Sequence, residues 1–185
     1  MKSTMTKLPI IVWALFAAAC NHSQETNQPS TAAVSNTAGQ SAVQDDVSAK
    51  NVVQIAIGSK DHSTLVTAVK AAELVDALSN AGPFTVFAPT NAAFEKLPTG
   101  TVDGLLKPEK KEALTDILQY HVSVGVYKEE SLQDGQILGQ VNGGNIKITK
   151  KDGSIYVNGK AKIIAAIPAS NGIVYIIDEV LLPEK

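Results

Sequence analysis

The sequence predicts one α+β domain over residues 50–185, with helices in its first half and antiparallel strands in its second. Apolar residues recur at helical spacing before Tyr127, whereas Asn-Gly and Asp-Gly pairs divide the chain after it. The two patterns do not alternate, which argues against regular βαβ units. A segment of this length matches one domain and needs no metal or disulfide for stability.

A first long helix is predicted between Asp61 and the Gly82-Pro83 pair, which cannot continue a helix. Asp61 or Ser63 could cap its first turn, because both have short side chains that accept hydrogen bonds. Apolar residues at helical spacing define its core-facing side, namely Leu65, Val69, Ala72, Leu74, Val75 and Leu78.

A short strand, a short helix and a second long helix follow. Residues 84–88 are rich in β-forming side chains and end at Pro89, so they are expected to form a strand. Thr90 is positioned to cap a short helix over 90–96. The next helix begins near Pro108, a residue favoured at a first helical position. Its apolar positions are Leu114, Ile117, Leu118 and His121.

The second half of the domain is predicted to be antiparallel. Asn-Gly and Asp-Gly tolerate the positive φ values of tight hairpins. These pairs are Asp134-Gly135, Asn142-Gly143, Asp152-Gly153, Asn158-Gly159 and Asn171-Gly172. The predicted strands cover residues 146–149, 155–157, 160–167 and 173–178.

The amino terminus has the features of an export signal over residues 1–19. Lys2 and Lys7 precede the apolar run Leu8–Ala19, which is shorter than the roughly 20 residues that span a bilayer. Small residues lead directly into Cys20, which resembles a bacterial lipoprotein signal with Cys20 as the acylated residue. Ordinary cleavage after an alanine, with Cys20 a free thiol, is the alternative. An acyl anchor would make the membrane a partner of this protein.

Residues 20–49 are expected to form a flexible tether behind the lipidated cysteine. Between Asn21 and Ala49, 15 of 29 residues are Ser, Thr, Asn or Gln. Such a segment cannot bury enough apolar area to offset its ordering entropy, and as a coil it would reach about 30 Å. Asn21 carries no inner-membrane retention signal, so an outer-membrane location is expected, on its periplasmic side or at the cell surface.

The composition argues against several classes of function. The chain has 16 Lys and no Arg, with 18 acidic residues and a net charge of −2, so nucleic-acid binding is not expected. One Cys and three scattered His residues cannot supply a Cys-rich or His-rich metal centre. No metal and no cofactor is predicted.

Three sequence blocks resemble the fasciclin domain. They are GPFTVFAPTNAAF at 82–94, Tyr120-His121 within LTDILQYHV, and ASNGIVYIIDEVLLP at 169–183. The resemblance covers Asn51 to Pro183 and implies a compact β-sandwich or wedge with several helices packed against it. It assigns a structural part to Phe84, Pro89, Thr90, Asn91, Asn171 and Gly172. Tyr175 stands where members of the family commonly have His, and its bulk and polar tip should preserve the fold.

The resemblance also implies adhesion or the binding of matrix, sugars or proteins. In animal members the Tyr-His region is linked to integrin binding, which makes candidates of Ile117, Leu118, Tyr120, His121 and Val122. The alternative is structural, because an imidazole on an apolar stripe is usually buried and hydrogen-bonded to backbone. A second integrin-linked motif should align near Ala166–Pro168, where its Asp is replaced by Ala166.

Five lysines flank two predicted hairpins and could form one basic face for anionic polysaccharide or lipid headgroups. They are Lys147, Lys150, Lys151, Lys160 and Lys162. The alternative, which we favour from the sequence alone, is that these lysines protect sheet edges against aggregation.

No catalytic residue is predicted. A hydrolase would need His121 beside Ser123 or Asp116, and no glycine elbow surrounds a serine. The function expected from the sequence is therefore a membrane-anchored, non-catalytic adhesion or binding module of the bacterial cell envelope, with a protein or polysaccharide ligand. The alternatives are a carrier of a small apolar ligand facing the periplasm and an envelope scaffold.

Overall fold

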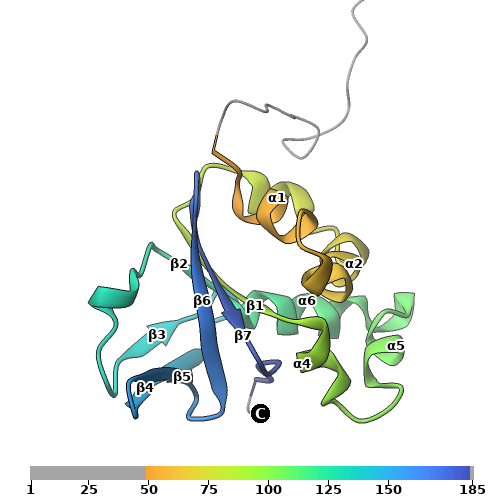
Figure 1. Cartoon of the computed structure of the whole chain (residues 1–185). Helices are drawn as coiled ribbons and strands as arrows, with labels where there is room; N and C mark the ends of the chain where they lie inside the picture. Colours follow the sequence, from red (N-terminus) through yellow and green to blue (C-terminus); the bar gives the residue numbers. More distant parts are fainter. Residues whose placement is uncertain (1–48, 184–185) are drawn as a thin grey trace, which may run out of the picture. The chain divides into compact units, whose positions relative to one another are not determined.

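The computed structural model describes residues 49–183 and confirms the predicted α+β class (Figure 1). The predicted signal peptide, Cys20 and residues 21–48 of the predicted tether lie outside the described residues. Within the described part, no helix is long and apolar enough to cross a membrane.

Six short α-helices lie mostly in the first half of the domain. They are α1 (Val52–Ile57), α2 (Ser63–Ala71), α3 (Val75–Ser79), α4 (Asn91–Glu95), α5 (Thr101–Leu105) and α6 (Lys111–Tyr120). Three single 3₁₀ turns accompany them, at Lys60–His62, Pro108–Lys110 and Glu129–Ser131. The predicted helix near Pro108 thus begins as a 3₁₀ turn and continues as α6.

Seven strands form one sheet in the order β2-β1-β7-β6-β5-β4-β3. The strands are β1 (Phe84–Pro89), β2 (Val122–Val124), β3 (Ile137–Gly139), β4 (Asn145–Lys151), β5 (Ser154–Val157), β6 (Ala161–Ala169) and β7 (Gly172–Ile177). All neighbours are antiparallel except β1 and β7, whose parallel pairing joins the first half of the domain to the last strand.

The two edge strands, β2 and β3, come together and nearly close the sheet into a barrel. The Val141 amide donates to the Val122 carbonyl at 2.8 Å, and Gln140 Nε2 donates to Ser123 Oγ at 2.8 Å. One backbone hydrogen bond is too few for a regular β-ladder, so β2 and β3 are not paired as neighbouring strands. The result is a wedge whose helices gather on one side of β1 and β7, with β3, β4 and β5 on the other (Figure 1).

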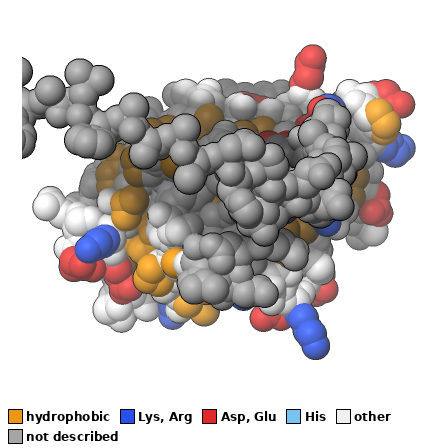
Figure 2. Space-filling view, turned by 90° about the horizontal axis from the view of Figure 1, so that it is seen from above, with side chains coloured by type: hydrophobic (Ala, Val, Ile, Leu, Met, Phe, Trp, Pro, Cys, Tyr) orange, Lys and Arg blue, Asp and Glu red, His pale blue; other side chains and the backbone are white. Residues whose placement is uncertain are grey.

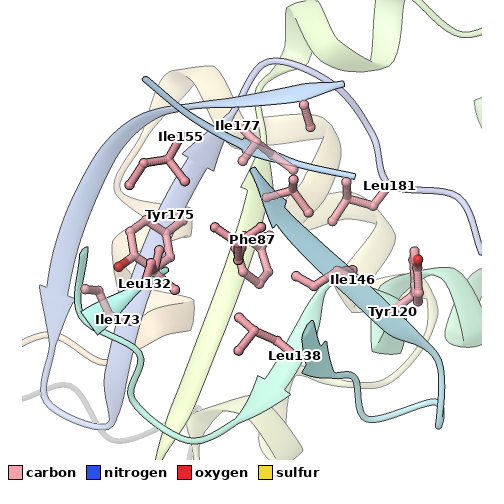
Figure 3. Packing of buried hydrophobic residues seen from close by; sticks show 13 residues of the cluster. Phe87, Tyr120, Leu132, Leu138, Ile146, Ile155, Ile173, Tyr175, Ile177 and Leu181 are labelled. Carbon is pink, nitrogen blue, oxygen red and sulfur yellow. The ribbon is translucent and has the colours of Figure 1, made fainter. Parts of the chain in front are cut away.

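Residues that alternate along β1 and β7 fill two separate cores. Phe87, Tyr175 and Ile177 point into the barrel, whereas Ala88 and Val174 face the helices. Figure 3 shows Phe87 at the centre of the barrel core, with Tyr175 on one side and Ile146 on the other. The rings of Phe87 and Tyr175 stack with centroids 5.7 Å apart, so Tyr175 preserves the fold as expected.

The first long helix is a wrong prediction, because the segment forms two helices. Glu73 adopts a φ of 58° and ends α2 before α3 begins. Neither Asp61 nor Ser63 caps α2 through its side chain. The cap comes from elsewhere in the chain, since Asn91 Oδ1 accepts a hydrogen bond from the Thr64 amide at 3.0 Å.

Two predicted hairpin turns have the expected backbone and a third does not. Asp152-Gly153 and Asn158-Gly159 have positive φ at both residues, from 51° to 71°. Asn171 and Gly172 also lie at a hairpin, between β6 and β7, but neither has a positive φ. Gly172 is needed for a different reason, because a Cβ there would overlap the Phe84 carbonyl oxygen on β1.

Candidate functional site

The predicted Tyr-His pair lies at the end of α6, inside the fold. Tyr120 is 4% exposed, and its hydroxyl donates to the Asn145 carbonyl at 2.8 Å while accepting from Asn158 Nδ2 at 3.1 Å. These bonds tie the helix to β4 and to the turn after β5. The Tyr120 hydroxyl therefore joins α6 to the barrel through both of these hydrogen bonds.

His121 is 3% exposed and both of its ring nitrogens are bonded to backbone. Nε2 accepts the Leu181 amide at 2.9 Å, so the proton lies on Nδ1, which donates to the Ile117 carbonyl at 2.8 Å. Burial lowers the pKa of His121 to about 4, against a weaker opposing effect of its bond to Ile117. The imidazole is thus a neutral bridge between α6 and the segment after β7.

The three apolar neighbours of this pair are largely inaccessible as well. Leu118 and Val122 are buried, and Ile117 is half-buried. This is the arrangement that the structural alternative predicts. Direct binding through these side chains stays a prediction, and it would require that part of α6 becomes exposed.

The structural motif residues hold the junction between helices and sheet. Thr90 Oγ1 accepts from the Ala93 amide at 3.3 Å and caps α4, as predicted. Asn91, beyond its cap on α2, donates from Nδ2 to the Lys60 carbonyl at 3.0 Å. Phe84 and Pro89 form the two ends of β1 and pair with Gly172 and Ile177 of β7.

Asn171 makes the largest set of bonds between distant elements. Its Oδ1 accepts from the Val52 amide at 2.9 Å, and its Nδ2 donates to the Leu78 and Asn80 carbonyls at 2.9 and 2.7 Å. Its own carbonyl accepts from the Phe84 amide at 3.0 Å. The Asn171 side chain therefore fixes α1 and the end of α3, and its backbone carbonyl fixes the start of β1.

The groups that a hydrolase would need are not assembled around His121. Ser123 Oγ accepts from Gln140, and Asp116 Oδ1 accepts from Asn142 Nδ2 at 3.0 Å. Among residues 49–183, no three His, Cys, Asp or Glu side chains are placed to hold a metal ion. Tyr175, whose hydroxyl donates to the Tyr127 carbonyl at 2.7 Å, has a pKa raised to about 12, mainly by burial and also by Glu129 and Glu130.

The five candidate lysines lie in three different places. Lys147 and Lys151 on β4 and Lys162 on β6 point away from the barrel, because they alternate with buried Ile146, Ile148 and Ala161. Lys150 lies instead at a cavity that it shares with Glu129 and Glu130. Lys160 follows the Asn158-Gly159 turn and borders a different groove, near Lys96 and Glu179.

Sequence reasoning also missed two further hollows in the surface. An apolar crevice between the helices and β1 has a volume of only about 40 Å³, far below that of ordinary ligand pockets. An open groove of about 680 Å³ lies beside the β6–β7 hairpin and is bordered by Pro83, Val126, Lys128, Glu130, Pro168 and Ile173. Only the Pro and Gly residues of its walls could have indicated a surface turn there.

In this fold, Tyr120, His121 and Asn171 use their polar atoms in hydrogen bonds that join distant segments. The family model for the fasciclin domain matches residues 60–183, and the chain therefore belongs to the fasciclin domain family. Members of this family are in general non-catalytic adhesion and binding proteins, and they are typically secreted or extracellular.

Relatives and a solved structure agree with this membership. Protein sll1483 of Synechocystis is 49% identical over 136 residues, which cover 74% of this chain and 75% of that protein. Immunogenic protein MPB70 of Mycobacterium bovis is 33% identical over 160 residues, covering 82% and 78%. Human periostin is 34% identical over 126 residues, covering 68% of this chain but 15% of periostin.

A FAS1 domain pair from the insect cell adhesion molecule Fasciclin I has the same fold. The two structures superpose with a TM-score of 0.64 at 20% identity, over 72% of this chain and 51% of that one. At this identity the likeness concerns the fold alone.

Proposed function

We propose that this protein is a membrane-anchored adhesion or binding module of the bacterial cell envelope, without catalytic activity. The observation that carries the proposal is that a fasciclin domain makes up almost the whole described part of the chain. Cys20 would be the lipidated residue, and residues 21–49 would hold the domain away from the membrane.

The interior of the domain supports a binding function rather than a catalytic one. Tyr120 and His121 both use their polar atoms in hydrogen bonds that hold α6 against neighbouring segments. We therefore expect a ligand to bind to the surface of the domain. In the view of Figure 2, lysine and carboxylate side chains are interspersed around the rim of the described part rather than gathered by sign.

Protease treatment of intact cells that produce the full chain tests the proposal. We expect cleavage between residues 21 and 49 to release the domain while a soluble periplasmic marker remains intact. A Cys20→Ala variant should lose membrane attachment and enter the soluble fraction, because the acyl chains supply the anchoring energy.

Two results would contradict the proposal in different ways. Release only after the outer membrane has been opened would exclude adhesion between cells and would move the search for a ligand to the periplasm. Membrane attachment that survives Cys20→Ala would exclude the lipid anchor while leaving the binding domain in place.

A further inference from the structure

Protection of the sheet edges does not account for all of the outward-facing lysines. Edge protection places charges on strands whose backbone groups are unpaired. Here β4 and β6 are interior strands, each hydrogen-bonded on both sides. The actual edges, β2 and β3, instead expose Val124 and Ile137, which are 65% and 66% exposed. Edge protection therefore does not account for Lys147 and Lys162, whereas Lys151 lies beyond the residues of β4 that pair with β3.

The strand register places the three lysines around one aromatic ring. Thr149 of β4 pairs with Tyr156 of β5, and Tyr156 pairs with Lys162 of β6, so these three side chains form a row across the outer face. Lys147 and Lys151 lie two residues before and after Thr149 on the same face of β4. We call these five residues the lysine–tyrosine face.

The spacing of this face suits a chain-like ligand with repeated charges. Lys147 and Lys151 are about 13 Å apart along their strand, and Lys162 lies two strands away from β4, about 10 Å across the sheet. All three lysines are exposed, and Tyr156 and Thr149 are half-exposed between them. The ligand would therefore meet an open outer surface of the barrel and not a closed pocket.

None of the five residues of the lysine–tyrosine face is acidic, and the nearby carboxylates lie outside it. Asp178, beyond Lys162, accepts that residue's backbone amide at 2.7 Å and lies 3.7 Å from Lys96 Nζ. Asp152 lies in the exposed turn that follows Lys151. The carboxylates Glu129 and Glu130 border the cavity of Lys150, which is outside the face.

We propose that the lysine–tyrosine face binds an anionic polysaccharide, a proposal that rests on the binding function above and names its ligand class. The face of the Tyr156 ring is electron-rich and stacks on the C–H groups of a sugar ring. Lys147, Lys151 and Lys162 pair with carboxylates on neighbouring sugars, and the Thr149 hydroxyl offers a hydrogen bond to sugar hydroxyls. We choose sugar rings over a bilayer because the half-exposed Tyr156 is the only aromatic ring of the face and offers little apolar surface to enter a membrane.

The test measures retention of the purified full-length chain, in a mild non-ionic detergent, on beads that carry polygalacturonate. Beads with neutral dextran are the polymer control. The face variant is Lys147→Gln/Lys151→Gln/Lys162→Gln, and the matched variant Lys60→Gln/Lys107→Gln/Lys110→Gln removes the same charge from exposed positions in the helical half. A third variant, Tyr156→Leu, removes the ring and keeps an apolar side chain. Thermal unfolding checks that each variant is folded.

We expect the face variant to weaken binding to polygalacturonate about tenfold, because three exposed ion pairs are lost. The matched variant should change it little, Tyr156→Leu should weaken it several-fold, and neutral dextran should retain none of the proteins. Raising the salt concentration should weaken the wild type more than the face variant.

Equal losses in both lysine variants, or no binding to polygalacturonate by the wild type, would overturn the proposal. Capture of vesicles with anionic phosphatidylglycerol, lost in the face variant while polygalacturonate is ignored, would also overturn it and assign the face to a membrane. These outcomes leave the protease result untouched, so a failure of the face is distinguishable from a failure of the envelope function.

Discussion

At the scale of single residues, His121 shows how a buried histidine joins two segments of the chain through both of its ring nitrogens. Its two backbone partners, Ile117 and Leu181, lie on opposite sides of the ring and require one tautomer. A second proton would place an N–H donor against the Leu181 N–H. The sequence indicated burial through the apolar stripe of α6, but the partner at Leu181 is 60 residues away and no local pattern indicates it.

We expect the protein to lose stability in mild acid because of His121. Its pKa is about 4 in the folded protein and 6.5 in the unfolded chain, so the unfolded chain binds the proton more tightly. The stabilising contribution is complete above about pH 6.5 and is lost as the pH falls toward 4, by about 3 kcal/mol in total. Urea unfolding at pH 7 and pH 4 measures the change.

Carboxylates also titrate at the acid end of this range, so an NMR titration of the His121 ring serves as the control. The ring should keep its neutral signals down to about pH 5, one unit above its lowered pKa. Titration at the ordinary value for histidine would contradict the assigned bonds. Burial lowers the pKa of His62 as well, so its contribution has the same sign.

At the scale of elements, local turn chemistry was the most predictable feature. Asp152-Gly153 and Asn158-Gly159 adopt positive φ because the residues themselves tolerate it. The break at Glu73 was not predictable, since Glu has no special preference for that conformation and the apolar stripe continues beyond it. The elements α1, α5, β2 and β3 were missed because each is too short to show a period.

Two glycine substitutions should have opposite effects on the free energy of unfolding. Gly172→Ala should cost about 3 kcal/mol or more, because its Cβ would overlap backbone atoms of Phe84 and push β1 from β7. Gly104→Ala, with open space in α5, should add about 0.5–1 kcal/mol through its better helix propensity. Chemical denaturation of both variants measures these changes. If Gly172→Ala left the free energy of unfolding unchanged, the backbones of β1 and β7 would have to lie farther apart at this position than the structure shows.

At the scale of the whole molecule, Asn171 links the helical layer to the sheet. Asn171→Ala removes three side-chain hydrogen bonds and takes their partner from the part-buried Val52 amide and Leu78 carbonyl and from the exposed Asn80 carbonyl. We expect a loss of about 2–4 kcal/mol in the free energy of unfolding, together with faster amide exchange in α1.

Ser170→Ala is the matched control for this variant. Ser170 is the exposed neighbour in the same hairpin, and its bond to the Lys50 carbonyl uses only its backbone amide. Its replacement should change stability by less than about 0.5 kcal/mol. Similar losses in the two variants would mean that the hairpin, and not the Asn171 side chain, joins the layers.

The sequence by itself determined that the first half of the domain is helical and the second half rich in strands, where two tight turns fall, and that the chain resembles the fasciclin family. Those properties depend on periodicity and on residues close together in the chain. The tertiary structure alone decided that β1 pairs in parallel with β7, and that Lys147, Lys151 and Lys162 share a face with Tyr156 while Lys150 and Lys160 do not. These outcomes depend on strand order and on bonds between distant segments, such as that from Val52 to Asn171 across 119 positions, which a local pattern cannot encode.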